Sequence, residues 1–110
     1  MRVLEESGLT MEYGYDFVFE KAGDMIYISH LDLLRLFARS ARRADLSISL
    51  TNGFNPHARI KLNKALKLGV ESNFEEGEII LNNNVEISEL KSRWQKELPA
   101  GITLKEVRLK

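Results

Sequence analysis

The stretch YGYDFVFEK, residues 13–21, decides how the rest of the chain must be arranged. Aromatic residues occupy every second position and the residues between them are mostly charged, namely Tyr15, Phe17 and Phe19 against Asp16, Val18 and Glu20. Side chains of a β-strand point alternately to opposite faces, so this pattern predicts a strand with one apolar face. Such a face needs a covering layer, which the following segments must supply.

A helix is predicted directly after this strand, over HLDLLRLFARSARRA, residues 30–44. Ser29 and Asp32 have the spacing of a capping box, in which side chains satisfy the free backbone donors of the first turn. Apolar residues at helical spacing form the expected core stripe: Leu34, Phe37, Ala38, Ala41 and Leu31. Arg35, Arg39 and Arg42 recur at helical spacing on another face, so the core side and the basic side separate.

The remaining segments complete an alternating order of strands and helices. LSISL (46–50), RIKL (59–62) and EIIL (78–81) alternate as strands, with an irregular hairpin joining the last two. ISELKSRWQKEL (87–98) predicts a second helix, capped by Ser88, whose apolar stripe is Ile87, Leu90, Trp94 and Leu98. ITLKEVRL (102–109) alternates as a last strand. The order predicts an α+β, ferredoxin-like two-layer sandwich (βαββαβ), an antiparallel sheet with both helices on one face.

The 110-residue length suits one domain, expected over residues 11–110 after a flexible N-terminal lead at residues 1–10. The lead has neither the basic nor the apolar region of a signal peptide, and no apolar run is long enough to cross a bilayer. We therefore expect a cytoplasmic protein without a membrane partner. The chain has no cysteine, which excludes disulfides and cysteine-ligated clusters, and no metal spacing appears, so we expect no cofactor.

The net charge of zero hides an uneven distribution. Residues 33–67 contain eight basic residues against one acid, a net charge of +7, and the remainder of the chain is therefore −7. A solvated helix face explains such a segment equally well as a surface for an anionic partner. Both interpretations stay open at this stage.

The segment TNGFNPHARI, residues 51–60, follows the predicted strand at 46–50. Gly53 and the Asn55–Pro56 pair are typical of a turn. The same loop would hold Asn55, His57, Arg59 and Lys61 close to phosphates if it faced a nucleic acid. Phe54 would then stack on a base, although an aromatic residue in a loop usually anchors the loop to the core.

His30 stands in the first turn of the predicted helix, where free N–H groups and the helix dipole favour an anion. Capping or packing is the alternative role for this residue. His30 and His57 could also act as general acid and base on an RNA 2′-hydroxyl, but residue type alone supports that idea. The sequence cannot fix the distance between the two imidazoles.

Residues 21–72 resemble the radical SAM-linked protein family, whose domain of unknown function is found beside or fused to radical SAM proteins. The resemblance is carried by SHLDLLRLFARSARRA (29–44), GFNPH (53–57) and LGVES (68–72). It implies a radical SAM protein as partner. The same arrangement is similar, more loosely, to the ferredoxin-like RNA-binding proteins of the RAMP superfamily, some of which cleave RNA.

Three hypotheses follow from these observations. The first is a non-catalytic RNA-binding or adaptor domain that works with a radical SAM partner in RNA modification. The second is a protein interaction module, docking on that enzyme or on a further copy of the chain through sheet edges. The third is a metal-independent, RAMP-like endoribonuclease that uses His30 and His57. The candidate RNA- or anion-binding residues are His30, Arg35, Arg39, Arg42, Arg43, Asn55, His57, Arg59 and Lys61.

Overall fold

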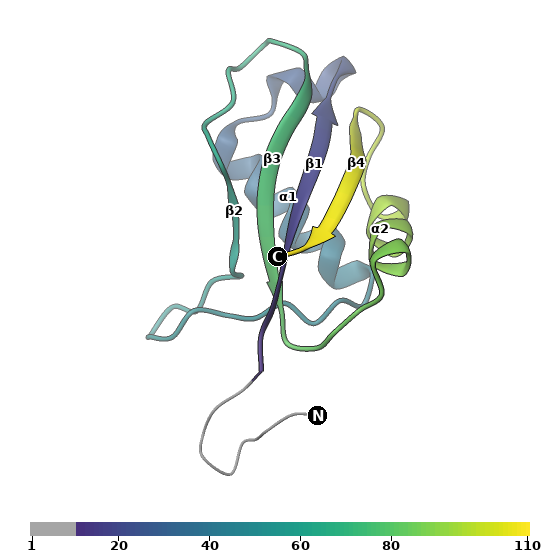
Figure 1. Ribbon diagram of the computed structural model, residues 1–110. Coiled ribbons are helices and arrows are strands. Elements are labelled where there is room, and N and C mark those ends of the chain that lie inside the picture. Colours follow the sequence, from purple (N-terminus) through teal and green to yellow (C-terminus); the bar gives the residue numbers. More distant parts are fainter. Residues whose placement is uncertain (1–10) are drawn as a thin grey trace.

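A computed structural model describes residues 11–110 (Figure 1). The predicted N-terminal lead, residues 1–10, lies outside the described residues. The strands are β1 (Tyr13–Lys21), β2 (Ile60–Leu62), β3 (Ser72–Leu81) and β4 (Ile102–Leu109). The helices are η2 (Gly23–Tyr27, 3₁₀), α1 (His30–Arg43) and α2 (Ile87–Lys96).

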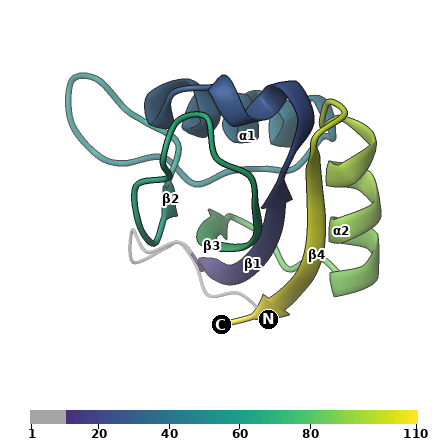
Figure 2. The same ribbon diagram turned by 90° about the horizontal axis from the view of Figure 1, so that it is seen from above.

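The strands form one antiparallel sheet in the order β2-β3-β1-β4, which confirms the predicted ferredoxin-like arrangement. β1 is central, and its Phe17 lies opposite Gly77 of β3 and Val107 of β4. Seen from above, α1 lies across one face of the sheet and α2 lies beside β4 (Figure 2). The two-layer architecture therefore follows from one apolar sheet face that needs cover.

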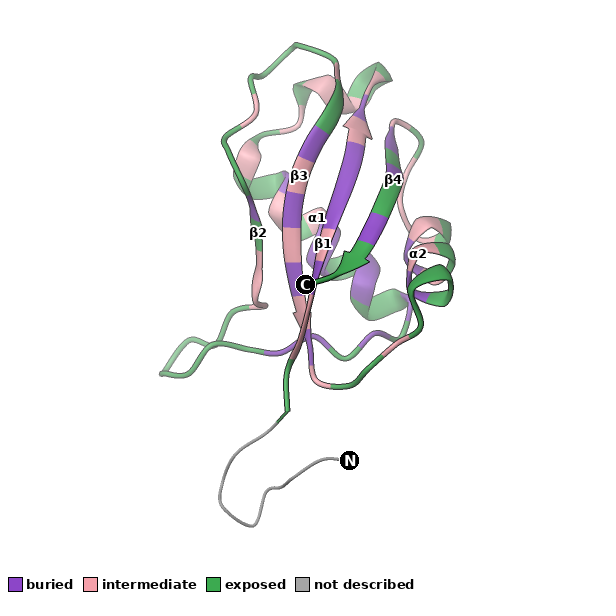
Figure 3. Ribbon diagram, viewed as in Figure 1, coloured by how far each residue is buried: buried purple, intermediate pink, exposed green. Residues whose placement is uncertain are grey.

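The core sits between β1 and the helices, and its centre is aromatic. Tyr15, Phe17 and Phe19 of β1 are fully buried, as Figure 3 shows along that strand. Phe37 of α1 packs on Phe17 and Phe19, and Trp94 of α2 packs on Phe17, with ring centroids 4.9–5.2 Å apart. Rings at these separations and tilts interact favourably beyond their area of burial.

The core-facing side of α1 differs in part from the prediction. Ser29 caps the helix as expected, because its Oγ accepts from the N–H of Asp32 at 3.1 Å. Leu33 and Ser40 are buried, whereas Leu34 is only half-buried and Leu31 is 55% exposed. The Ser40 hydroxyl is tolerated in the core because it donates to the Phe37 carbonyl and accepts from the Trp94 indole N–H. Leu31 and Leu34 are thus left on the flank of the helix.

The segment LSISL, residues 46–50, is not the strand that its alternation predicts. It forms only isolated bridges, Ile48 with Leu81 and Leu50 with Ala58. The backbone of Ser49 explains this, because its N–H donates to Ile80 and its carbonyl accepts from Arg59. In a regular antiparallel strand the N–H and the C=O of one residue point to the same neighbouring strand, so this division at Ser49 interrupts the ladder.

Some of the predicted strand and helix boundaries are confirmed and others are wrong. β1 and β4 have the predicted bounds, and β2 begins one residue later than expected. β3 begins at Ser72, six residues before the predicted strand, because it pairs with β1 along its whole length. The cap of α2 is Glu86 rather than Ser88, since the Glu86 carboxylate accepts from both the Glu89 N–H and the Ser88 hydroxyl.

Candidate functional site

A groove of about 610 Å³ lies between the exposed flank of α1 and the segment that leads into β2. One wall is helical and the other is the chain from Pro56 to Ile60. The floor is apolar and the rim is cationic. The lining residues are Leu31, Leu34, Arg35, Ala38, Arg39, Arg42, Pro56, His57, Ala58 and Ile60.

Three arginines form the cationic rim on the helical wall. Arg35, Arg39 and Arg42 follow one another at intervals of four and three residues, so neighbouring Cβ atoms are about 5–6 Å apart. Arg35 is paired with Asp32 at 3.4 Å, but both side chains are more than 60% exposed and such a pair is weak. Within residues 11–110, no ion pair involves Arg39 or Arg42. The rim therefore carries positive charge that no acid in the described part of the chain fully neutralises.

The opposite wall is a loop held closed at its base. The Thr51 N–H donates to the His57 carbonyl at 2.9 Å, and the His57 N–H donates to the Thr51 hydroxyl at 3.0 Å. These bonds fix the position of Pro56 and His57, which line the groove. The turn residues thus shape the chain and also present an imidazole beside the arginines.

Two predicted site residues, Arg59 and Lys61, lie elsewhere. Ile60 lines the groove, and strand alternation turns its neighbours toward the other side of the sheet. The Arg59 guanidinium donates to Glu12 at 2.6 Å, and Lys61 pairs with Glu78 at 3.5 Å. Their charge is therefore already compensated, and they do not line the groove with Arg39.

The other predicted residues also lie outside the groove lining. Arg43 is bound to the side chain and the carbonyl of Glu97, at 3.3 and 3.2 Å. Asn55 is exposed in the loop. His30 is the first residue of α1, half-buried, with an Nδ1 atom that is buried and has no hydrogen-bond partner among residues 11–110. The groove thus contains His57 without His30, so its lining does not supply the pair of histidines that the ribonuclease hypothesis needs.

The open face of the sheet offers no comparable site. β1 presents Asp16, Val18 and Glu20 there. β3 presents Phe74, which is 57% exposed, on the same face as Glu76 and Glu78. An exposed ring is therefore present on this face, but the charged side chains that follow it along β3 are carboxylates, which repel phosphates. Basic side chains on this face are matched to acids: Lys61 and Lys110 with Glu78, Lys105 with Glu20, Arg108 with Glu106. Lys110 in particular lowers the pKa of Glu78, through its hydrogen bond and its charge. Phosphates would meet a balanced surface on this side.

The apolar floor was missed by sequence reasoning. Leu31 and Leu34 were expected in the core stripe together with Ala38, which is buried as expected and also lines the groove. They lie immediately beside the arginine row on the helix surface. Apolar residues directly beside a row of arginines on one helix are the signal that could have predicted a groove with an apolar floor and a cationic rim. The same residues were instead assigned to a stripe buried in the core.

Comparison with known proteins places the chain in a family. Residues 15–109 match the family described as "Uncharacterized protein conserved in bacteria (DUF2344)". The chain belongs to this family. No curated protein and no solved structure matches this DUF2344 chain. Within residues 11–110 there is no cluster of three or more potential metal ligands, and no helix has the length and apolar character to cross a bilayer.

Proposed function

We propose that this chain is a non-catalytic RNA-binding domain whose groove holds the RNA backbone. The observation that carries the proposal is the charge of Arg39 and Arg42, which form no ion pair within residues 11–110 and lie beside His57 over an apolar floor. Guanidinium groups are suited to phosphate oxygens because of their planar fork of donors. Leu31, Leu34 and Ile60 would lie against the less polar parts of the nucleotides.

The arrangement of the cations favours a chain of phosphates over a single anion. Positions 35 to 42 span about 10 Å of helix axis, at 1.5 Å per residue. In a row of that length, each arginine can contact a different phosphate of a polyanion. A small anion would contact the arginines at only one end of the row. The balanced charge of the open sheet face supports the groove as the binding surface.

We further propose that the domain acts as an adaptor and serves a radical SAM partner that modifies RNA. This proposal is based on the resemblance of residues 21–72 to radical SAM-linked proteins. In this role the domain holds the substrate while the partner supplies the chemistry. Co-purification of the chain with a radical SAM protein from the same organism tests the partnership independently of RNA binding.

RNA binding is tested by fluorescence anisotropy with labelled single-stranded RNA of roughly 12 nucleotides. If three phosphates are neutralised, the affinity should fall about 20-fold between about 50 and 200 mM salt. Arg39→Glu should abolish binding at low salt. Lys96→Glu is the matched control, because it makes the same charge change on an exposed position of α2, away from the groove. The proposal is wrong if wild-type protein does not bind at low salt, or if both variants lose affinity equally.

One observation favours a second function, the docking of an acidic protein segment. Within residues 11–110, β2 has β3 as its only strand partner, so its outer edge is free beside the groove. An extended peptide adding to such an edge would run past the arginines of α1. A pull-down with the radical SAM protein tests this function. If the wild-type chain binds no RNA, and if charge reversal at Arg39 and Arg42 abolishes the complex, the result favours docking of an acidic protein segment.

A further inference from the structure

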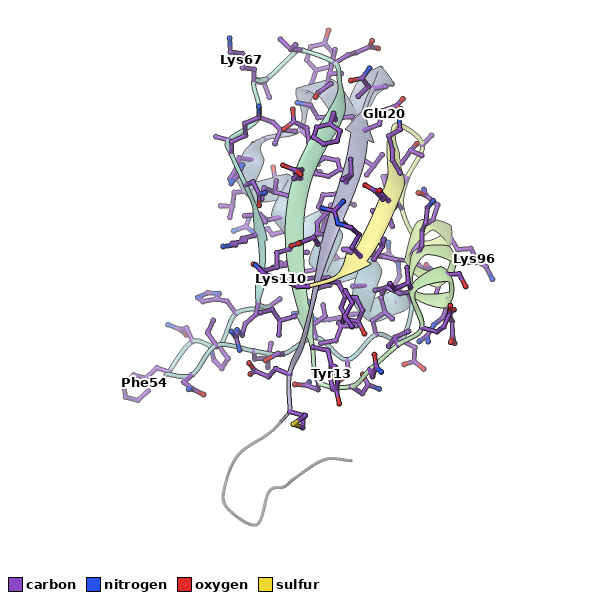
Figure 4. All side chains as sticks on the ribbon, in the orientation of Figure 1. Tyr13, Glu20, Phe54, Lys67, Lys96 and Lys110 are labelled. Carbon is purple, nitrogen blue, oxygen red and sulfur yellow. The ribbon has the colours of Figure 1, made fainter. Side chains whose placement is uncertain are left out.

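Phe54 is completely exposed. Its relative exposure is 103%, higher than that of the other large apolar residues in 11–110, and Figure 4 shows it at the outer end of the loop. A phenylalanine ring gains substantial free energy on burial, and most loop aromatics take that gain by packing on the core. Phe54 does not pack on residues 11–110, so this gain in free energy is left for a ligand.

The backbone conformation of the loop holds the Phe54 ring away from the domain. Gly53 has φ of 120°, a conformation that side-chain-bearing residues rarely adopt, and it directly precedes Phe54. Pro56 fixes its own φ and favours an extended Asn55. The hydrogen bonds between Thr51 and His57 close the base of the loop. The aromatic ring is thus displayed on a braced loop, which lowers the entropic cost of binding through it.

Phe54 also lies next to the cationic groove. It is two residues before Pro56, which lines the groove, so their Cα atoms are at most about 7 Å apart. A polyanion held by the arginines would therefore pass within reach of the ring. An exposed aromatic next to a cationic track is the combination by which proteins bind single-stranded nucleic acids.

We propose that Phe54 is a stacking platform for an unpaired base, and that the ligand class of the groove is single-stranded RNA. This inference rests on the proposed RNA-binding function and specifies its substrate. In a duplex both faces of each internal base are covered by neighbouring bases, so along the helix one projecting ring has no base face to meet. In a single strand or a loop, bases are free to stack on an aromatic side chain.

The test compares binding of a single-stranded RNA and a duplex of matched length by wild-type protein and by Phe54→Ala, Phe54→Leu and Phe54→Trp. Phe54→Ala should weaken binding of the single strand about 10-fold or more, and Phe54→Trp should retain it, since stacking needs a π-face. Phe54→Leu should be as weak as Phe54→Ala. A 2-aminopurine base in the single strand should be quenched by wild-type protein and not by Phe54→Ala. Duplex binding should not distinguish the variants.

The control is Leu68→Ala, which removes another exposed apolar side chain, 64% exposed, from a different loop. Because Phe54 has no packing role, thermal denaturation should show that all variants fold as the wild type does. Equal binding by Phe54→Leu and wild type would mean apolar insertion and would overturn the stacking proposal, as would unchanged binding by Phe54→Ala. A change in oligomeric state on Phe54→Ala would instead assign the ring to an interface between copies. Absence of RNA binding by the wild type would remove the proposed function itself.

Discussion

Arg39 and His57 line the same groove, although they are 18 positions apart and belong to different kinds of structure. Arg39 is placed by the helix that covers the sheet, and His57 by a loop that is closed through Thr51. The two meet because the segment 46–51 returns along the end of β3, through the bridge of Ile48 with Leu81. The site is therefore a product of the tertiary fold and would be lost when the domain unfolds.

Arg39 and Arg59 should differ sharply in RNA binding, although each substitution to alanine removes the same charge. Arg39→Ala should reduce the magnitude of the salt slope of log affinity by about 0.7, the effect of one phosphate contact to a single strand. Arg59→Ala should leave the slope unchanged, because Arg59 pairs with Glu12 outside the groove. Its cost should be in stability, at most about 1 kcal/mol, as for a partly exposed ion pair. Anisotropy titrations at several salt concentrations distinguish the two, and equal loss of slope would place RNA on the other face.

Much of the fold was predictable because its signals are local. The alternation in β1 and β4 and the Ser29 cap of α1 each depend on a few neighbouring residues. The segment 46–50 carries the same alternation, yet its hydrogen bonds depend on residues 58–59 and 80–82. No local pattern shows how those bonds are divided.

The candidate site was only partly predictable for the same reason. Helical spacing places Arg35, Arg39 and Arg42 on one flank, as expected. Alternation shows that Arg59 and Ile60 face opposite ways, but which of them faces α1 depends on the register of β2 against β3. Phe54 presented the same difficulty, because exposure of a loop residue depends on the conformation of the whole loop.

Gly77 should not tolerate a methyl group. A Cβ at this position would be 2.5 Å from Cζ of Phe17 and 2.8 Å from the Lys61 carbonyl oxygen. Gly77→Ala should therefore reduce the free energy of unfolding by about 1–3 kcal/mol through overpacking. Gly14→Ala is the matched control in the neighbouring strand, since its nearest contact would be an ordinary 3.5 Å. Urea denaturation should show Gly14→Ala unchanged or up to about 1 kcal/mol more stable; equal destabilisation would contradict the packing argument.

Gln95 should protect the edge of β4. Its side-chain amide donates to the Ile102 carbonyl at 3.1 Å and accepts from the Leu104 N–H at 2.6 Å, as a neighbouring strand would. Gln95→Ala should reduce the free energy of unfolding by about 1–2 kcal/mol, because two backbone groups lose their partners. It should also promote concentration-dependent association through the freed edge, measured by light scattering. Gln95→Glu keeps the acceptor for Leu104, so it should stay monomeric to higher concentration than Gln95→Ala, and the reverse order would contradict this role.

Glu78 should make stability depend on pH in the acidic range. Lys110 and Lys61 bind its two carboxylate oxygens, at 3.0 and 3.5 Å, and hold its pKa below the ordinary value of 4.5. A carboxyl whose pKa is lower in the folded state contributes stability that is present above its unfolded pKa and is lost as pH falls through the folded pKa. Wild-type protein should therefore lose stability below pH 4.5 more steeply than Glu78→Gln, with the two curves converging at the lowest pH.

The control for this experiment is Glu76→Gln, on the same face of β3. Within residues 11–110 no ion pair involves Glu76, so this substitution should leave the shape of the curve close to that of the wild type. Lys110→Met should flatten the wild-type curve in the same window as Glu78→Gln, because it removes the largest cause of the lowered pKa. Denaturation midpoints measured from neutral pH down through pH 4.5 provide the comparison. Parallel curves for wild type and Glu78→Gln over that range would show that the two lysines do not stabilise the carboxylate in the folded protein.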